Sequence, residues 1–244
     1  MDKLWKYIIL ASAVVLSAMV LAAAFTSKSR EAGTIAVTGL GETEFVSDLI
    51  VINGVLTVNN SDVAAGYNEL ETKSRRIVDF LVSKGVDTVA LSFDMPTISE
   101  NYESLYADGN YAGSKMNGYS LFQSFTIESK EIDKVEAAAR ELTSLMTEGV
   151  MVTVNEPAYY YTELESVKHE LIGLAAADAR QRADIIATNS NARLGQLASS
   201  RAGVFQITAA TGDEEFSAGG SFNTSSREKK ARVTVRAEYK IKIN

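Results

Sequence analysis

The chain has 244 residues, of which 46% are hydrophobic and only 2 are proline, so it can bury a core and fits neither a disordered nor a collagen-like class. It contains no cysteine, which excludes disulfides, thiolate catalysis and thiolate metal sites. The net charge of −7 is unevenly distributed, because residues 1–30 carry four basic side chains and one acidic side chain while the remainder is acidic. Since nucleic acid is bound by clustered Lys and Arg, the acidic remainder predicts no nucleic-acid partner.

The amino-terminal segment Tyr7–Phe25 carries no charge. As a helix it would be about 28 Å long, close to the hydrocarbon thickness of a bilayer. It therefore predicts one membrane-spanning helix, residues 7–25, in contact with lipid, with residues 1–29 as the anchor and residues 30–244 as one domain on the outer side. Two other interpretations stay open. One is a signal peptide cleaved near Ala22–Ala24, and the other is a buried core helix, although the segment lacks the polar face that such a helix normally keeps.

The domain is expected to begin with two strands. Thr34–Thr38 alternates apolar and polar residues and predicts a short strand that ends in a turn at Gly39–Gly41. A longer strand is expected over Glu42–Val58. The glycines do not form a dinucleotide-binding loop, because such a loop must open a helix rather than precede a strand. A helix is then predicted from its cap at Asp62 to about Lys84, with a glycine at its end.

The middle of the domain alternates strands with a second helix. Val86–Phe93 predicts a strand, and Thr97–Tyr106 with Tyr119–Glu128 predicts a long hairpin around the sequence Asp108-Gly109-Asn110. The next helix is expected over Lys130–Glu148.

Strand, helix and strand recur in Val46–Phe93 and Tyr119–Val154, which predicts two similar β-α-β layers. The remainder is expected to form the longest helix, a strand, a mobile Gly- and Ser-rich loop and a closing strand, over Glu163–Asn189, Val204–Thr208, Thr211–Ser226 and Ala231–Ile243. Together the elements predict an α+β fold with a mixed or antiparallel sheet and about three helices, preceded by the transmembrane helix.

Candidate catalytic groups are few. His169 is the only histidine, so the chain cannot complete a histidine-based triad or a two-histidine metal site, and we expect this side chain at the surface. Asp213, Glu214 and Glu215 are expected in a solvated loop, because they lack the ligand spacing of a calcium loop. We therefore predict no catalytic residue, no cofactor and no metal.

Tyrosines form the one unusual concentration of aromatic residues. They occur in the predicted hairpin and directly before the longest helix, at positions Tyr102, Tyr106, Tyr111, Tyr119, Tyr159, Tyr160 and Tyr161. Tyrosine is favoured in strands and at subunit interfaces, and it can also surround a ligand. The candidate interface or ligand contacts are Tyr102, Tyr106, Tyr159, Tyr160 and Tyr161.

Three stretches together resemble the SIMPL-domain family, also called DUF541. They are Ile35–Gly39 with Gly41 and Glu42, the alanine-rich helix through Ala175, Ala179, Arg180, Ala183 and Ala187 to Leu194 and Gly195, and the closing strand. The resemblance is to bacterial periplasmic proteins described as oxidative-stress defence proteins and to an antigen of 26 kDa. It implies a ring- or channel-shaped homo-oligomer and no catalytic residue.

We therefore expect a non-enzymatic envelope protein of a bacterial inner membrane, with its carboxy-terminal domain outside, that assembles with itself into a ring or cage and contributes to envelope or oxidative-stress tolerance. A periplasmic stress module or chaperone that binds a peptide or another ligand near the tyrosines is the alternative. An enzyme with a carboxylate-based site is the third interpretation.

Overall fold

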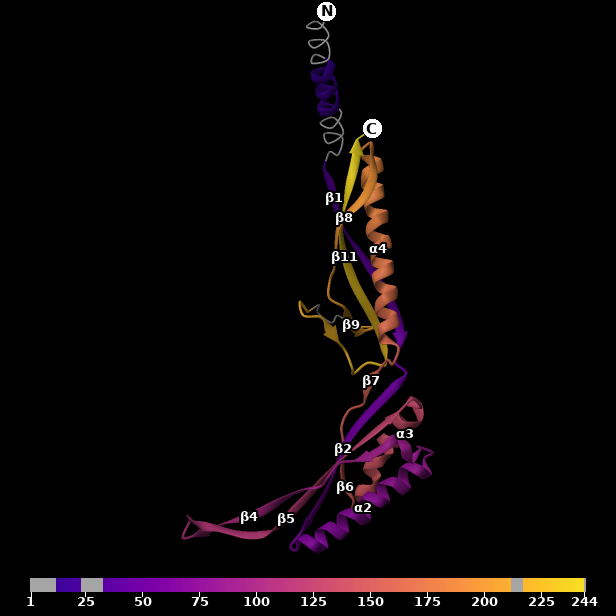
Figure 1. Ribbon diagram of the computed structural model, residues 1–244. Helices are drawn as coiled ribbons and strands as arrows, with labels where there is room; N and C mark the ends of the chain where they lie inside the picture. The colour runs from indigo at the N-terminus through magenta and orange to yellow at the C-terminus, as the bar shows by residue number, and fades with distance from the viewer. Residues whose placement is uncertain (1–11, 23–32, 212–216, 244) are drawn as a thin grey trace, which may run out of the picture.

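The computed structural model describes residues 12–22, 33–211 and 217–243, and the chain forms an elongated molecule with two lobes (Figure 1). The terminal lobe contains residues 33–46 together with residues 161–243 of the described chain. The inserted lobe contains residues 49–160. The chain crosses between the lobes twice, once on the way out and once on the way back. The lobes have separate hydrophobic cores.

The described part of the amino-terminal segment, residues 12–22, is helical with exposed side chains. Among the residues that the structure describes, no helix combines the length and apolar character needed to cross a membrane. This finding contradicts the predicted transmembrane helix over Tyr7–Phe25 and the inner-membrane location. The two ends of that prediction, residues 7–11 and 23–25, lie outside the described residues.

The inserted lobe is an antiparallel sheet covered by two helices. Its strand order is β3-β5-β2-β6, with β4 paired to β5 and β7 paired to β2. The strands are β2 (Leu49–Asn60), β3 (Leu91–Phe93), β4 (Thr97–Ala107), β5 (Asn110–Ser129), β6 (Met151–Val154) and β7 (Ala158–Tyr160). The helices are α2 (Val63–Ser83) and α3 (Ile132–Leu142), and α3 continues into a 3-10 turn (Thr143–Glu148). The chain order β2-α2-β3-β5-α3-β6 in this sheet is the ferredoxin-like arrangement, which confirms two β-α-β layers.

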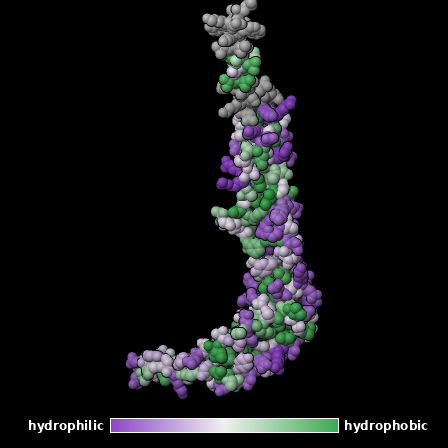
Figure 2. All heavy atoms as spheres, in the orientation of Figure 1, coloured by the Kyte–Doolittle hydropathy of each residue, from purple (hydrophilic) through white to green (hydrophobic). Residues whose placement is uncertain are grey.

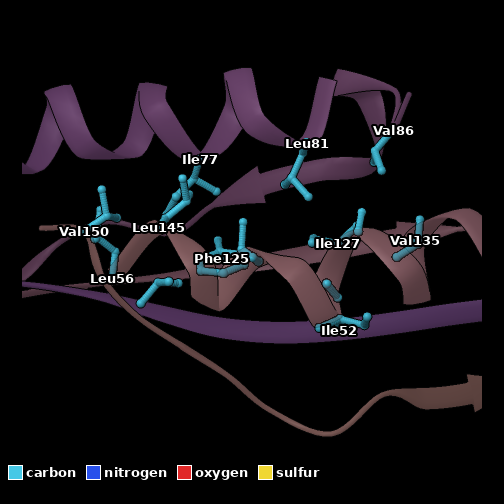
Figure 3. Packing of buried hydrophobic residues seen from close by; sticks show 14 of the residues in the cluster. Ile52, Leu56, Ile77, Leu81, Val86, Phe125, Ile127, Val135, Leu145 and Val150 are labelled. Atoms are coloured by element: carbon cyan, nitrogen blue, oxygen red, sulfur yellow. The ribbon is translucent and has the colours of Figure 1, made fainter. Parts of the chain in front are cut away.

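The core of the inserted lobe is built from large aliphatic side chains and one phenylalanine. The Asp62 carboxylate accepts a hydrogen bond from the Ala65 N–H and starts α2, which then places Ile77 and Leu81 on its buried stripe. Figure 3 shows these side chains above Phe125 and Leu56 of the sheet. Large buried side chains therefore fill the core of this lobe and exclude water from it.

The terminal lobe is a second sheet with one long helix. Its path is β1-β11-β9-β10, and β8 also pairs with β11. The elements are β1 (Thr34–Val46), α4 (Leu164–Asn189), β8 (Ala192–Ala202), β9 (Gln206–Ala209), β10 (Ser221–Phe222) and β11 (Glu228–Ile243). The long helix and the closing strand are confirmed. α4 lies along β1 and β11, and the residues of β11 that face it are buried at alternate positions, Ala231, Val233, Val235, Ala237 and Tyr239.

Glycine and alanine bring α4 unusually close to β1. A Cβ added to Gly39 would lie 2.1 Å from the Ala175 carbonyl oxygen and 2.4 Å from the Ala179 nitrogen, and one added to Gly41 would lie 2.2 Å from the Leu171 carbonyl oxygen. No side chain fits at these positions. The prediction of a turn at Gly39–Gly41 is wrong, since β1 continues through both residues, and the glycines are needed for helix-sheet contact.

Two further sequence predictions are corrected. The strand expected over Glu42–Val58 is divided between β1 and β2 at Ser47 and Asp48, where the chain crosses between the lobes. The strand expected over Val86–Phe93 is a 3-10 turn (Thr88–Ala90) followed by the short β3, because the Asp87 carboxylate accepts from the Val89 N–H and caps that turn. β8 was not expected at all. Of the predicted Gly- and Ser-rich loop, residues 212–216 lie outside the described residues.

Candidate functional site

The candidate tyrosines lie in two separate places. Tyr102 and Tyr106 lie on the hairpin of β4 and β5, which projects from the far end of the inserted lobe (Figure 1). Tyr159, Tyr160 and Tyr161 lie where the chain returns to the terminal lobe. The structure therefore does not bring the five residues into one site.

The projecting part of the hairpin, residues 101–118, is called the hairpin arm here. β2 pairs with β5 only as far as the partners Asn60 and Tyr119, so beyond that point β4 and β5 pair only with each other in the described chain. Asp108 and Gly109 have φ of 50° and 79°, the conformation that a two-residue hairpin turn needs, which confirms the predicted turn. Figure 2 shows the hairpin arm as a narrow projection with hydrophilic and intermediate residues on the visible face.

One face of the hairpin arm carries exposed aromatic side chains. Tyr102 is opposite Met116 and Tyr106 is opposite Tyr111, and residues opposite each other share a face. Tyr102, Tyr106 and Tyr111 are 60%, 70% and 63% exposed. The rings of Tyr106 and Tyr111 are 6.2 Å apart, edge to face. The Tyr102 hydroxyl donates to the Glu100 carboxylate at 2.6 Å, and this hydrogen bond raises the pKa of Tyr102. Tyr102, Tyr106, Tyr111 and Met116 are together called the tyrosine face.

A pocket of about 480 Å³ lies beside Tyr159, between α3 and the short segment that joins β6 to β7. Residues of both lobes line it: Ile52, Glu136, Ala139, Arg140, Thr143, Val154, Asn155, Glu156, Pro157, Tyr159 and Ser225. We call it the junction pocket. Apolar and polar residues both line it, and a mixed lining of this kind is usual for a small-molecule site.

Tyr159 is the buried polar group of the junction pocket, with 8% of its surface exposed. Burial raises the pKa of the Tyr159 hydroxyl, and the nearby Glu136 carboxylate raises it further. Glu136 also forms an ion pair with Arg140 one helical turn away. Next to the pocket, Arg227 of the terminal lobe forms an ion pair with Asp133 of α3, and this contact lowers the pKa of Asp133. The site therefore offers a neutral hydroxyl between opposite charges.

The other two tyrosines of the run have structural contacts at the junction. Tyr160 pairs with Leu49 in the sheet, and its ring is 6.4 Å from that of Phe222. The Tyr161 ring is 4.9 Å from that of Phe45 in the terminal lobe. These contacts hold the two crossings together.

A group of basic residues on β8 and β11 is not apparent from the sequence alone, because the pairing of the two strands brings them together. The pairing of the two strands places Arg201 opposite Arg236 and Arg193 opposite Lys242, with Lys240 on the same strand. We call these five residues the basic strip. The alternation of apolar and charged residues along β11 indicates one charged face. The group could not be recognised from it, because the partner strand β8 was not predicted.

The remaining candidates have simple outcomes. His169 is exposed on α4, as predicted. Asp213, Glu214 and Glu215 lie outside the described residues. Over the described ranges, no group of three or more His, Cys, Asp or Glu side chains is arranged to hold a metal ion.

The fold and these surfaces define a two-lobed α+β protein with a projecting aromatic hairpin. Residues 35–239 match the SIMPL family, described as a protein of unknown function (DUF541), and the chain belongs to that family. No curated protein matches the sequence, so the expected likeness to periplasmic stress proteins and to the 26 kDa antigen is not confirmed.

Three similar solved structures each cover less than half of this chain. The de novo designed protein Foldit4 is 9% identical, with 44% of this chain and 93% of that chain covered, at a TM-score of 0.26. GlnK of B. subtilis is 13% identical, with 43% and 83% covered, at a TM-score of 0.25. CutA from Synechococcus elongatus PCC7942 is 11% identical, with 48% and 85% covered, at a TM-score of 0.21. Similarities at this level carry no conclusion about function.

Proposed function

We propose that this SIMPL protein is a non-enzymatic structural protein that assembles with copies of itself through the hairpin arm. The observation that carries the proposal is the tyrosine face, three well-exposed tyrosines on a two-stranded ribbon that lies outside both cores. Tyrosine is among the residues most enriched at the centres of protein interfaces. The ring-shaped assemblies that the family resemblance implies agree with such a role.

The energetics of the hairpin arm also support a partner. An isolated two-stranded hairpin is marginally stable in water, and both outer edges of the ribbon present backbone groups without a strand beside them in the described chain. A partner that covers the tyrosine face would stabilise the ribbon and remove this apolar surface from water.

Sedimentation velocity of the full chain at micromolar concentration tests the proposal. The wild-type protein is expected to sediment as an oligomer, and the variant Tyr102→Ser/Tyr106→Ser/Tyr111→Ser as a monomer with unchanged circular dichroism. Tyr67→Ser is the matched control, because Tyr67 is 50% exposed on α2 and is not part of the tyrosine face. A monomeric wild type, or a triple variant that assembles normally, would contradict the proposal.

The junction pocket favours a second candidate function, that of a binding module for a small ligand or a peptide. Its support is the buried Tyr159 side chain beside Glu136 and Arg140 in a pocket that apolar residues also line. Native mass spectrometry of the purified protein should then find a bound mass that is lost in Tyr159→Phe, while the oligomeric state is unchanged. No bound mass in the wild type, or an equal bound mass in both proteins, would count against this candidate.

A further inference from the structure

We infer that the hairpin arm of one copy binds the basic strip on the terminal lobe of the next copy. The inference rests on the proposed assembly and names its receiving surface. It commits to a second copy of this chain because the two surfaces are complementary in charge and chemistry and lie at opposite ends of one molecule.

The basic strip lies on the open face of the terminal sheet. Buried residues of β11 alternate with exposed ones and pack toward α4, so Arg236 lies on the other face, and Arg201 shares that face as its cross-strand partner. Like charges directly opposite each other destabilise a sheet. Within residues 33–211 and 217–243, no ion pair joins Arg193, Arg201 or Arg236 to a carboxylate. An acidic partner would relieve this repulsion.

One carboxylate lies within the strip, and its bonds are internal. Glu238 accepts hydrogen bonds from the hydroxyls of Thr34 at 2.5 Å and Ser199 at 3.2 Å. Together with Glu238, this part of the sheet has five basic residues and one acidic residue. The sheet face is basic although the chain as a whole has a net charge of −7.

The hairpin and its base have the complementary composition. Residues 97–118 carry three carboxylates, Glu100, Glu103 and Asp108, against the single basic residue Lys115, and all four are exposed. Glu100 shares the face of Tyr102, whereas Glu103 lies on the other face of the ribbon, opposite Lys115. The tyrosine rings beside Glu100 add a second attraction, because an arginine guanidinium stacks on an aromatic face while it donates hydrogen bonds to a carboxylate. Tyrosine with carboxylate on one surface and arginine on the other is a combination typical of interface hot spots.

The shape of the molecule excludes a contact within one copy. The hairpin arm projects from the far end of the inserted lobe, whereas β8 and the end of β11 lie at the other end of the terminal lobe (Figure 1). A contact between copies that uses two different surfaces is heterologous. Such contacts produce a closed ring when the rotation closes and a filament when it does not. Every copy then provides one arm and one strip.

The test uses the full chain in two interface variants and a control. The arm variant is Tyr102→Ser/Tyr106→Ser, the strip variant is Arg201→Glu/Arg236→Glu, and the control is Arg180→Glu on the exposed side of α4. The control should assemble like the wild type, while each interface variant alone should self-associate at least about tenfold more weakly in sedimentation velocity. An equimolar mixture of the two variants should form a dimer with one copy of each and stop there, because only one intact arm meets one intact strip.

Each other outcome has a defined meaning. A strip variant that assembles like the wild type, while the arm variant stays monomeric, overturns the inference and leaves the proposed assembly with another receiving surface. An arm variant that assembles like the wild type overturns both. A mixture that stays monomeric overturns the head-to-tail contact even when both variants are well folded by circular dichroism.

A charge exchange separates direct contact from damage to the fold. Glu100→Arg in the arm should restore assembly when this variant is mixed with the strip variant Arg201→Glu/Arg236→Glu, because Glu100 lies beside Tyr102. Failure to restore it would count against direct pairing. Vesicles with anionic lipid are the probe for a different occupant. A wild-type protein that stays monomeric and binds these vesicles through Arg201 and Arg236 would overturn the inference and assign the strip to a lipid surface.

Discussion

The two lobes place a helix on a sheet by opposite means. In the inserted lobe, large side chains such as Leu56, Ile77 and Phe125 fill the space between α2, α3 and the sheet. In the terminal lobe, the buried stripe of α4 becomes a row of alanines toward its end, and glycines of β1 lie beneath it. The first interface gains stability from the apolar area that it removes from water, and the second from close contact of two backbones. The inserted lobe should therefore be destabilised most by a substitution that leaves a cavity. The terminal lobe should be destabilised most by a substitution that adds an atom between α4 and β1.

Phe125→Ala should have the largest effect. Phe125 is 1% exposed, and removing its ring leaves a cavity in the inserted lobe, so we expect a loss of about 4 kcal/mol in the free energy of unfolding. Denaturation by urea measures it, and hydrogen exchange should show the opening confined to residues 49–160. Phe122→Ala is the control, because Phe122 is 39% exposed and its removal should cost about 1 kcal/mol or less. Equal effects of the two substitutions would contradict the comparison.

Gly39→Ala should destabilise the other lobe by adding a single methyl group. The new Cβ would lie 2.1 Å from the Ala175 carbonyl oxygen, and because the obstacle is backbone, α4 must move away from β1. We expect a loss of about 3 kcal/mol, with faster hydrogen exchange in α4 and unchanged exchange in α2. Unchanged stability would show that α4 does not require this close approach.

Asp48→Asn should weaken the junction between the lobes. The Asp48 carboxylate accepts hydrogen bonds from the Thr162 N–H at 2.7 Å and the Thr162 hydroxyl at 2.5 Å. Burial works to raise the pKa of Asp48, but the bonds from Thr162 outweigh it and hold the pKa below the ordinary value of 3.8. The stabilisation is therefore present above pH 3.8 and is lost as the pH falls below it.

At pH 7 we expect Asp48→Asn to lose about 1 kcal/mol, since the amide keeps an acceptor but not the charge. The difference from the wild type should shrink below the ordinary carboxyl pKa, which urea denaturation at several pH values would measure. Asp184→Asn is the control, because Asp184 is exposed on α4. A difference between Asp48→Asn and the wild type that is constant with pH would contradict the assigned charge.

Gly173→Ala should have the smallest effect and the opposite sign. Gly173 is also on α4, but no atom lies within 4 Å of the position of an added Cβ. Alanine restricts the unfolded chain and favours the helix, so we expect a gain of about 0.8 kcal/mol, measurable as a higher midpoint of thermal unfolding. A loss of stability would mean that this side of α4 is covered by another molecule, which sedimentation of the variant would detect.

Local signals predicted the elements whose causes are local. The cap at Asp62 and the apolar spacing after it located α2, and the sequence Asp108-Gly109 located the hairpin turn. α4 followed from its length and spacing.

Features that depend on distant partners could not be predicted in this way. Gly39 resembles a turn residue until α4 is placed above it, and β8, which begins at Ala192, is a polar stretch that becomes a strand only beside β11. The basic strip exists only through that pairing. Tyr159 and Glu136 meet because α3 and β7 lie on the same side of the junction.

The pairing of β1 with β11 also constrains the order in which parts of the protein can fold during synthesis. Thr34 pairs with Lys240, and within the described chain β1 pairs with no strand other than β11, so the first strand of the terminal lobe has no partner strand until the last strand has left the ribosome. At about 5 to 20 residues per second, synthesis of the intervening chain takes on the order of 10 to 40 s. The inserted lobe is complete by residue 160 and can fold during that time. We therefore expect a nascent chain whose middle is folded while β1 waits as an unpaired edge, which makes this strand the segment most in need of a chaperone.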